Sequence, residues 1–592
     1  MTVKPPIKIA NCSGFYGDKL SAAKELVEGG PIDVLTGDYL AELTMAILFN
    51  QQRRSPEKGY VGTFIKQMRD VMEQCLNKNI KVVSNAGGLN PKGMAQALQT
   101  LADELGLKAK IAYIDGDDLM PKMAELQHRG EAFINMDSGQ PLQASGLEPV
   151  TANAYLGCWG IKEALDQGAD IVVCPRVTDA AVVIGPAAWY YNWQREDYDA
   201  LAGALAAGHI IECGLQATGG NYAFFQDVPS FENMGYPIAE IAENGSCVIT
   251  KHIGTGGLVS VGTVSAQLLY EIGAPEYLNP DVTAHFDTLQ LEQVGDDRVR
   301  VFGCKGSAPP PSHKVCINTR GGYRNSMNLI VPGLDVELKA KLFETALFNA
   351  LGGKEQFDRV DVQLVRSDKE SPNSNEEAFA ILRIHVMSLD EHKVGRLFSA
   401  KVIELALANY PGFAALDTPG EAKPYIVYWP ALISSDKIVE RVHIDHKTLK
   451  ILPTQQLEHA DPVVTKPSIT SVPVPNGARQ SVALGRIYGA RSGDKGGSAN
   501  VGLWANSAEA YAFLESYLSV DEFKKLLPDL RDYDITRYEL PNIFAVNFLV
   551  KDILGQGVSS STRMDGQGKT LGEYIRAKII QAPLAIIPEQ YR

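Results

Sequence analysis

The segment GHIIECGLQATGGN, residues 208–221, gathers several reactive side chains in a short stretch. If its first half is helical, His209 and Cys213 lie four residues apart on one face, with Glu212 beside them. This spacing predicts proton transfer: His209 is a general base, Glu212 is an acid or an orienting group, and Cys213 is a nucleophile if its pKa is lowered. The alternative is a buried structural cysteine beside a hydrogen-bonded histidine. Without a second cluster at ligand spacing, we expect no metal site here.

A second candidate is the glycine-rich stretch RSGDKGGSAN, residues 491–500. Its backbone N–H groups and cations could hold a carboxylate or a phosphate, and a solvated loop with an internal Asp–Lys pair is the alternative. The stretch is not a Walker P-loop, because Asp494 stands where the motif requires a glycine. The sequence GKT at 568–570 matches the end of the same motif, but Arg563 stands where its first glycine is required. The candidate binding residues here are Arg491, Ser492, Asp494, Lys495 and Ser498.

Short apolar runs alternate with helix-like stretches over the first 220 residues. The runs lie at 7–10, 34–35, 81–83, 110–114, 132–136 and 171–173. Between two of them an apolar stripe at helical spacing is formed by Met94, Leu98, Leu101 and Leu105. This alternation predicts right-handed βαβ crossovers, and therefore an α/β body with a doubly wound, mostly parallel, Rossmann-like sheet.

Polar and glycine residues follow these apolar runs, where the predicted strands end. In an open parallel sheet such ends share one edge, and ligands bind in the crevice outside it. We therefore expect a binding site at this edge of the sheet, with Asp179 as a further catalytic residue beside His209, Glu212 and Cys213. The other candidate binding residues are Asn11, Ser13, Gly14, Asn85, Gly87, Gly88, Arg176, Thr178, Gly219, Gly220 and Asn221.

The first predicted turn, CSGFYG at residues 12–17, partly matches a dinucleotide-binding fingerprint, but Cys12 stands where the first glycine is required. Anion binding at the start of the next helix and a plain tight turn are the other interpretations. The sequence therefore leaves the cofactor unknown.

Changes in composition divide the 592 residues into four parts. We expect a Rossmann-like part at 1–220 and a second α/β or α+β part at 221–452. A proline-rich linker follows at 453–480. The order of elements in 481–592 favours a small α+β domain of the ferredoxin type.

The overall composition restricts the classes of partner and compartment. A net charge of −14 disfavours nucleic acid, since such binding needs clustered Lys and Arg. No window approaches about 18 apolar residues, so we expect no membrane span. Eight cysteines without a close CxxC pair, and a start without signal-peptide features, favour the cytoplasm. A homo-oligomer is the expectation for a large protein of this kind.

Five separated segments resemble the acyclic terpene utilisation family, AtuA: IANCSGFYGD, SNAGGLNP, VCPRVTDAA, GHIIECGLQATGGN and GARSGDKGGSANVGLW. The resemblance implies a large AtuA domain to about residue 455 and a ferredoxin-like domain after it. It also implies a role in bacterial breakdown of citronellol and geraniol, a route through branched acyl-CoA thioesters.

Three functions remain open on these grounds. The leading one is a lyase or hydro-lyase acting on a branched hydroxyacyl-CoA or hydroxyacid, with a small-molecule substrate and no nucleic-acid or membrane partner. The second is a non-catalytic acyl-CoA-binding or assembly partner of the pathway's acyl-CoA enzymes. The third is a nucleotide-dependent enzyme on a Rossmann-like sheet.

Overall fold

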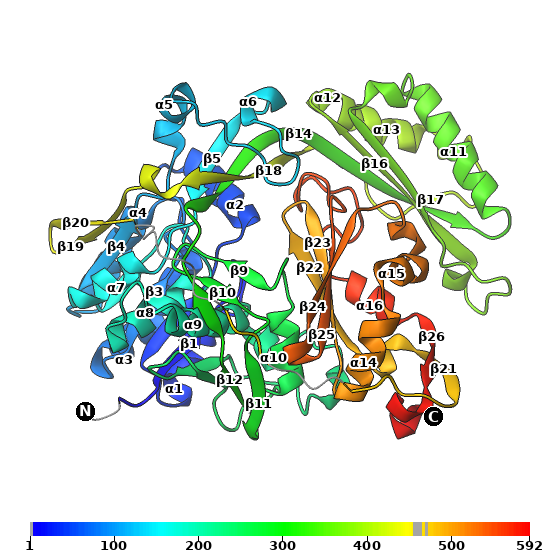
Figure 1. Ribbon diagram of the computed structural model, residues 1–592. Helices are drawn as coiled ribbons and strands as arrows, with labels where there is room; N and C mark the ends of the chain where they lie inside the picture. The colour runs from blue at the N-terminus through cyan, green and yellow to red at the C-terminus, as the bar shows by residue number, and fades with distance from the viewer. Residues whose placement is uncertain (1–3, 454–463, 468–471) are drawn as a thin grey trace. The chain divides into compact units, whose positions relative to one another are not determined.

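The computed structural model of the chain describes residues 4–453, 464–467 and 472–592 (Figure 1). The described residues form two compact units. The first takes residues from Met1–Asn318, Tyr428–Val558 and Gln567–Arg592, and the second from Thr319–Val427 and Ser559–Gly566. The predicted linker 453–480 lies partly outside the described residues. Within the described ranges, no helix is both long and apolar enough to cross a membrane.

An eleven-stranded sheet, in the order β11-β12-β8-β7-β1-β2-β3-β6-β4-β19-β20, is the centre of the first unit. Its five middle strands pair in parallel. They are β1 (Ile7–Asn11), β2 (Val34–Gly37), β3 (Lys81–Ser84), β6 (Ile171–Val173) and β4 (Ile111–Asp115). The strands expected at 7–10, 34–35, 81–83, 110–114 and 171–173 are therefore present, and helical crossovers join them.

The flanks of this sheet are antiparallel, so the prediction of a mostly parallel, doubly wound sheet is not confirmed and the sheet is mixed. The physical reason is that short hairpins can join only antiparallel strands. The flanking strands are β7 (Ile238–Ile241), β8 (Cys247–Thr250), β12 (Arg298–Phe302), β11 (Gln290–Gly295), β19 (Glu440–Ile444) and β20 (Lys447–Ile451). The run at 132–136 forms no strand.

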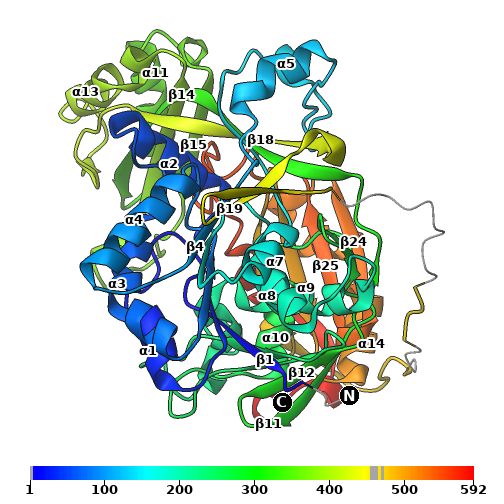
Figure 2. The ribbon, with the colours of Figure 1, turned by 90° about the vertical axis from the view of Figure 1, so that its left-hand side faces the viewer.

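Helices cover both faces of the parallel region (Figures 1 and 2). Side chains alternate across each strand, so Leu35 joins one apolar core and the adjacent Val34 joins the other. One face carries α1 (Ala22–Gly29), α3 (Gly62–Asn77) and α4 (Pro91–Glu104), and the other carries α7 (Trp159–Asp166), α8 (Ala181–Tyr191) and α9 (Tyr198–Ile211). The stripe Met94, Leu98 and Leu101 is buried as predicted, whereas Leu105 follows the end of α4 and is 39% exposed.

Further elements complete the body around the sheet. A three-stranded sheet consists of β13 (Lys305–Ser307), β10 (Thr283–His285) and β9 (Glu276–Leu278). Also present are α2 (Glu42–Arg54), α5 (Met123–His128), α6 (Leu142–Ser145), β5 (Pro149–Ala154) and α10 (Val261–Leu268).

The C-terminal part of the first unit contains a four-stranded antiparallel sheet, β22-β23-β25-β24. Three helices pack on one of its faces through a separate apolar core. The strands are β22 (Gly489–Lys495), β23 (Ser498–Trp504), β25 (Ala545–Val550) and β24 (Ile535–Leu540), and the helices are α14 (Ala508–Tyr517), α15 (Val520–Leu526) and α16 (Leu571–Arg576). A two-stranded sheet joins β21 (Arg479–Ala483) to β26 (Ile579–Pro583).

The other face of this small sheet packs against the turn that follows α10. Asn500 donates from Nδ2 to the carbonyl of Leu269 at 2.6 Å and accepts from the N–H of Glu271 at 2.9 Å. Asn547 donates to the carbonyl of Gly273 at 2.9 Å. A Cβ on Gly502 would lie 2.7 Å from the Cβ of Leu269. The glycines and asparagines of the strands therefore allow close approach of two backbones.

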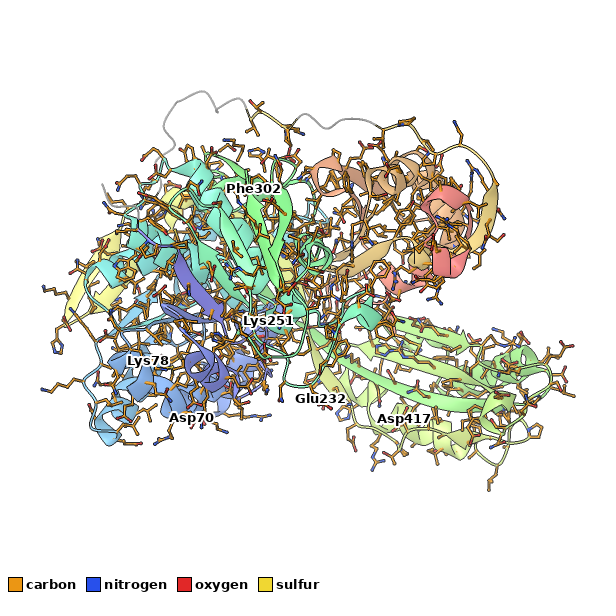
Figure 3. The ribbon with its side chains drawn as sticks, turned by 90° about the horizontal axis from the view of Figure 1, so that it is seen from below. Asp70, Lys78, Glu232, Lys251, Phe302 and Asp417 are labelled. Carbon is orange, nitrogen blue, oxygen red and sulfur yellow. The ribbon has the colours of Figure 1, made fainter. Side chains whose placement is uncertain are left out.

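The second unit is a sheet built on β14 (Ser312–Pro332), β15 (Arg359–Val365), β16 (Phe379–Ser388), β17 (Ala414–Ala415) and the start of β18 (Lys423–Ser434). Its apolar core includes residues of α11 (Val336–Ala350), α12 (Glu391–Val394) and α13 (Arg396–Glu404). Asp417, labelled in Figure 3, holds β14 by accepting from the backbone N–H of Asn328 at 3.0 Å.

The close approach at Gly502 gives a first prediction. Gly502→Ala should lower the free energy of unfolding by about 1–3 kcal/mol, the usual cost of overpacking a filled contact. The matched control is Gly273→Ala in the facing turn, where a Cβ meets nothing within 4 Å. Urea unfolding of the three proteins measures the difference, and equal midpoints for the two variants would contradict the packing described.

Candidate functional site

The end of helix α9 carries the first group of predicted residues. His209 lies in its last turn and is 2% exposed, and the N–H of Glu212 donates to the carbonyl of Gly208 at 2.8 Å. The helix ends at Ile211, so Cys213 does not share a helical face with His209. Burial and the charge of Glu212 raise the pKa of Cys213, which keeps it a thiol. This environment disfavours the predicted nucleophile.

The end of β1 is tied to this helix end by one amide side chain. Nδ2 of Asn11 donates to the carbonyls of Ile211 at 2.8 Å and Glu212 at 2.9 Å. The same group also reaches the carbonyl of Ser13 at 2.9 Å. Asn11 therefore fixes the backbone from which the Glu212 carboxyl group projects.

The ends of β2 and β3 meet at the same place. Asp38, the residue after β2, accepts a 2.5 Å hydrogen bond from Nδ2 of Asn85, the residue after β3. Oδ1 of Asn85 accepts from the N–H of Tyr39 at 2.8 Å, and the N–H of Asp38 donates to Ser13 at 3.0 Å. The structure thus brings together residues that follow three parallel strands, at the edge of the sheet where the sequence predicts a site.

Three carboxyl groups converge at this edge. One oxygen from each of Asp38, Asp179 and Glu212 lies within 4.8 Å of the other two. Nη1 of Arg176 pairs with Asp179 at 2.7 Å, and its guanidinium lies 4.1 Å from the centre of the Tyr155 ring. Arg176 is 2% exposed, so this pairing is what allows its charge to be buried.

Burial shifts the titration of these carboxyl groups. It raises the pKa of both Asp38 and Glu212, and the neighbouring charge of Asp179 raises both further. Arg176 opposes this shift at both groups, and Lys495 opposes it at Glu212. The environment therefore favours protonated carboxyl groups at Asp38 and Glu212.

His209 is shifted in the opposite direction. Burial, and then the charge of Lys495, lower its pKa to about 4. Its Nδ1 lies 3.1 Å from Oε1 of Glu212. Neither ring nitrogen makes an aligned hydrogen bond to any of the described residues. The ring is therefore neutral at pH 7 and can accept a proton.

The predicted glycine-rich stretch forms the hairpin β22–β23. The charged residues at its tip act on the carboxyl groups and on His209. Lys495 keeps solvent contact, yet the surrounding protein and the charge of Lys314 lower its pKa. Burial raises the pKa of Glu271 to about 8 and that of Asp494 to about 6, and the charge of Asp494 adds to the shift at Glu271. Several groups with displaced pKa values in one place are typical of an active site.

Arg491 lies on this hairpin but is already engaged. Its Nη2 donates to Oε1 of Gln216, its Nη1 contacts the carbonyl of Asn221 at 3.4 Å, and its guanidinium lies 4.3 Å from the ring centre of Tyr270. These contacts join the hairpin to the turn after α9, so Arg491 holds the two segments together.

The structure gives the remaining predicted residues contacts that hold the backbone. A Cβ on Gly14 would lie 2.6 Å from the backbone of Cys213, and Gly88 and Gly219 have left-handed φ values. The following residues make close packing contacts or hydrogen bonds: Gly87 against Cys174, Gly220 against Leu215, Thr178 with the Asn279 side chain, Ser492 with the backbone of Gly572 and Ser498 with the backbone of Asp552.

The candidate list from the sequence lacks five residues of this group: Asp38, Glu42, Tyr155, Glu271 and Lys314. Asp38 follows an apolar run in the same way as Asn11, so it lies on the predicted edge although it is not among the candidates. Glu42 accepts from the Tyr155 hydroxyl at 3.0 Å and lies 3.6 Å from Lys314. Although burial acts against it, the charges of Lys314 and Arg176 lower the pKa of Glu42 to about 2. No local pattern marks Tyr155 or Lys314.

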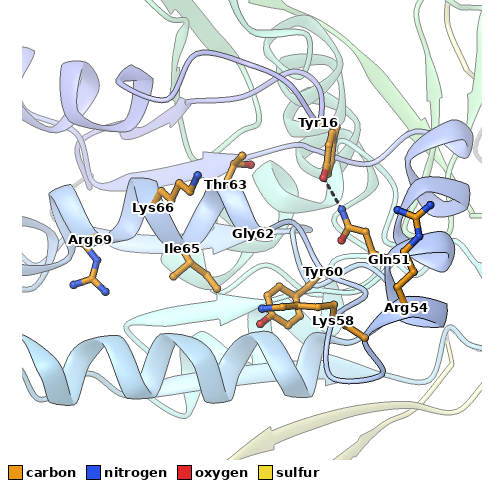
Figure 4. A pocket seen from close by; sticks show the side chains of 11 residues that line it. Tyr16, Gln51, Arg54, Lys58, Tyr60, Gly62, Thr63, Ile65, Lys66 and Arg69 are labelled. Carbon is orange, nitrogen blue, oxygen red and sulfur yellow. Dashed lines mark hydrogen bonds between the residues drawn. The ribbon is translucent and has the colours of Figure 1, made fainter.

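A cavity of about 670 Å³ lies elsewhere, between α2, α3 and the loop after β1 (Figure 4). Its lining includes the cations Arg54, Lys58, Lys66 and Arg69 and no carboxylate among the described residues. Tyr16 accepts a hydrogen bond from Gln51 at 2.7 Å within it. It contains none of the predicted site residues, and its four cations suit an anionic ligand.

The family model described as acyclic terpene utilisation family protein AtuA matches residues 7–444. The chain belongs to this family. A second model, the AtuA ferredoxin-like domain, matches residues 482–581 and confirms the expected type of the C-terminal domain. No curated protein matches the chain. AtuA membership places the chain in the context of acyclic terpene utilisation, as the resemblance of its five segments indicates.

The environment of His209 gives a second prediction. Its folded-state pKa of about 4 lies below the ordinary 6.5, so the stability it contributes is complete above pH 6.5 and is lost as the pH falls towards 4. From pH 7 to 4 the native chain should lose about 3 kcal/mol more than His209→Gln. Urea unfolding at several pH values measures this. The exposed His128→Gln should follow the native curve, and a native-like curve for His209→Gln would contradict the prediction.

Proposed function

We propose that this AtuA protein is a hydro-lyase or lyase that acts on a branched hydroxyacyl-CoA or hydroxyacid. The reaction takes place where the ends of β1, β2 and β3 meet the end of α9. The observation that carries the proposal is the contact between His209 and Glu212, whose pKa values move in opposite directions. A neutral base beside a protonated acid is the arrangement that proton-transfer enzymes use.

In the dehydration direction, His209 removes the proton on the carbon next to the substrate carbonyl. Glu212 donates its proton to the departing hydroxyl, which leaves as water. One C–H and one C–O bond break and one C=C bond forms, and hydration is the reverse reaction. Arg176 and Lys495 supply positive charge for the carboxylate or thioester oxygen on which negative charge develops.

The surroundings of His209 support an apolar substrate. Its ring centre lies 5.1 Å from that of Tyr277 and 5.5 Å from that of Phe286. Phe286 is 1% exposed. Aromatic walls exclude water from the proton transfer and accommodate a branched hydrocarbon chain, consistent with the family's context of acyclic terpene utilisation.

The third prediction concerns this acid–base pair. His209→Gln and Glu212→Gln should each lower kcat by about 10²–10⁴, the usual contribution of a positioned acid or base. The assay follows the formation of enoyl product from branched hydroxyacyl-CoA substrates by mass spectrometry. His128→Gln serves as the control. Activity retained in both variants would remove α9 from the mechanism.

A non-catalytic acyl-CoA-binding protein is the second candidate, favoured by the cationic cavity of Figure 4. Lys58 lies 5.7 Å from the ring centre of Tyr60, so a cation and an aromatic surface occur together there. Such a site fits the phosphates and adenine ring of CoA. In this role the chain would accompany the acyl-CoA enzymes of the pathway, as one copy of a homo-oligomer.

The fourth prediction tests the cavity. Lys58→Ala combined with Lys66→Ala should weaken CoA binding at least tenfold and reduce its salt dependence, because two cations are removed. Calorimetry measures the affinity, and Lys162→Ala on α7 is the control. Unchanged CoA binding would exclude the cavity as the CoA site.

Thermal shifts with NAD and ATP test the nucleotide-dependent alternative, because a ligand that binds only the folded state raises Tm.

A further inference from the structure

We infer that Asp38, Asp179 and Glu212 together bind a divalent cation of the magnesium, manganese or calcium type. The inference rests on the proposed function, because it concerns the same edge of the sheet and supplies an electrophile for the same reaction. It replaces our expectation that the chain has no metal site.

The separations of the three carboxyl groups suit one coordination shell. Their oxygens lie within 4.8 Å of one another. Opposite ligands of Mg²⁺ are about 4.2 Å apart and those of Ca²⁺ about 4.8 Å, since their bond lengths are about 2.1 and 2.4 Å. Three carboxylate oxygens without a thiolate are the donors that these hard cations prefer.

An unpartnered polar atom provides an independent indication of a ligand. Oε2 of Glu212 is buried and makes no hydrogen bond to any described residue, and the whole side chain is only 10% exposed. His209 lies 3.1 Å from the other oxygen of the same carboxyl group. Buried polar atoms normally have a partner, so Oε2 of Glu212 points to a group bound beside it.

The balance of charge also favours a cation. Arg176 and Lys495 oppose the charge of the three carboxylates, but they leave one negative charge uncompensated when all three are ionised. A divalent cation bound between the three carboxylates would compensate that charge.

Two of the three carboxyl groups, and the backbone of the third residue, are held by neighbours before any ion binds. Asn85 holds Asp38 at 2.5 Å, and Arg176 holds Asp179 at 2.7 Å. Asn11 fixes the backbone of Glu212. Partners of this kind orient the ligands of metal sites, and they lower the cost of assembling the site.

A cation in this position would polarise the hydroxyl group of the substrate. It would take the place of the Glu212 proton as the electrophile that helps the C–O bond to break, and the departing hydroxide would take up the proton that His209 removes from carbon and would leave as water. His209 would remain the base, because it does not need to coordinate the ion.

The fifth prediction is that the full-length chain, treated with chelator, binds one Mn²⁺. Electron paramagnetic resonance measures this as loss of the free Mn²⁺ signal, and thermal shift compares Mn²⁺, Mg²⁺ and Ca²⁺. Asp38→Asn, Asp179→Asn and Glu212→Gln should each weaken Mn²⁺ binding at least tenfold. Asp166→Asn, an acid-to-amide change on α7 with a 39% exposed side chain, should bind as the native chain does.

Measurements on the native chain alone keep the test decisive if a variant does not fold. Excess Mg²⁺ should displace the bound Mn²⁺, because both cations prefer the same oxygen ligands. No Mn²⁺ binding by the native chain, binding that excess Mg²⁺ does not displace, or native affinity in all three variants would overturn the inference.

His209→Gln separates the inference from the proposed function. We expect this variant to bind Mn²⁺ with native affinity while losing turnover. If it keeps both, the proposed role of His209 fails and the metal site stands. If the native chain turns over substrate without binding any divalent cation, the proposed function stands and the metal site fails.

Discussion

The burial of Arg176 is the constraint on which the rest of the site depends. A guanidinium that is 2% exposed must be paired, and Asp179 and the face of the Tyr155 ring provide that environment. Its charge in turn acts on Asp38, Glu42 and Glu212. One buried cation therefore lowers the pKa of groups from a strand end, a helix start and a helix end, against the effect of burial.

The small C-terminal sheet adds to this environment through a close backbone contact. Asn500 and Gly502 allow the sheet to lie directly on the turn after α10, and Asn547 fixes the contact from the next strand. This places the hairpin tip where the charge of Lys495 lowers the pKa of His209. The domain matched as ferredoxin-like thus takes part in the electrostatics of the site.

The strongly acidic composition makes local cations important. With a net charge of −14, the field of the whole chain opposes an anionic substrate. Arg176 and Lys495 act against that field at the sheet edge, whereas Arg491 is held by Gln216 and Tyr270. The cavity between α2 and α3 is another place where cations gather.

The sequence by itself determined the family, the strand and helix periods of the parallel region, and the strand-end residues Asn11, Asn85 and Arg176. These follow from local rules, because strand ends of parallel crossovers must meet at one edge. Only the tertiary structure decided that the sheet is mixed and that α9 ends before Cys213. It also decided that Asp38, Asp179 and Glu212 converge. Their convergence depends on segments that lie more than a hundred residues apart in the chain. Their pKa values depend on burial and on neighbouring charges, which local spacing in the sequence does not show.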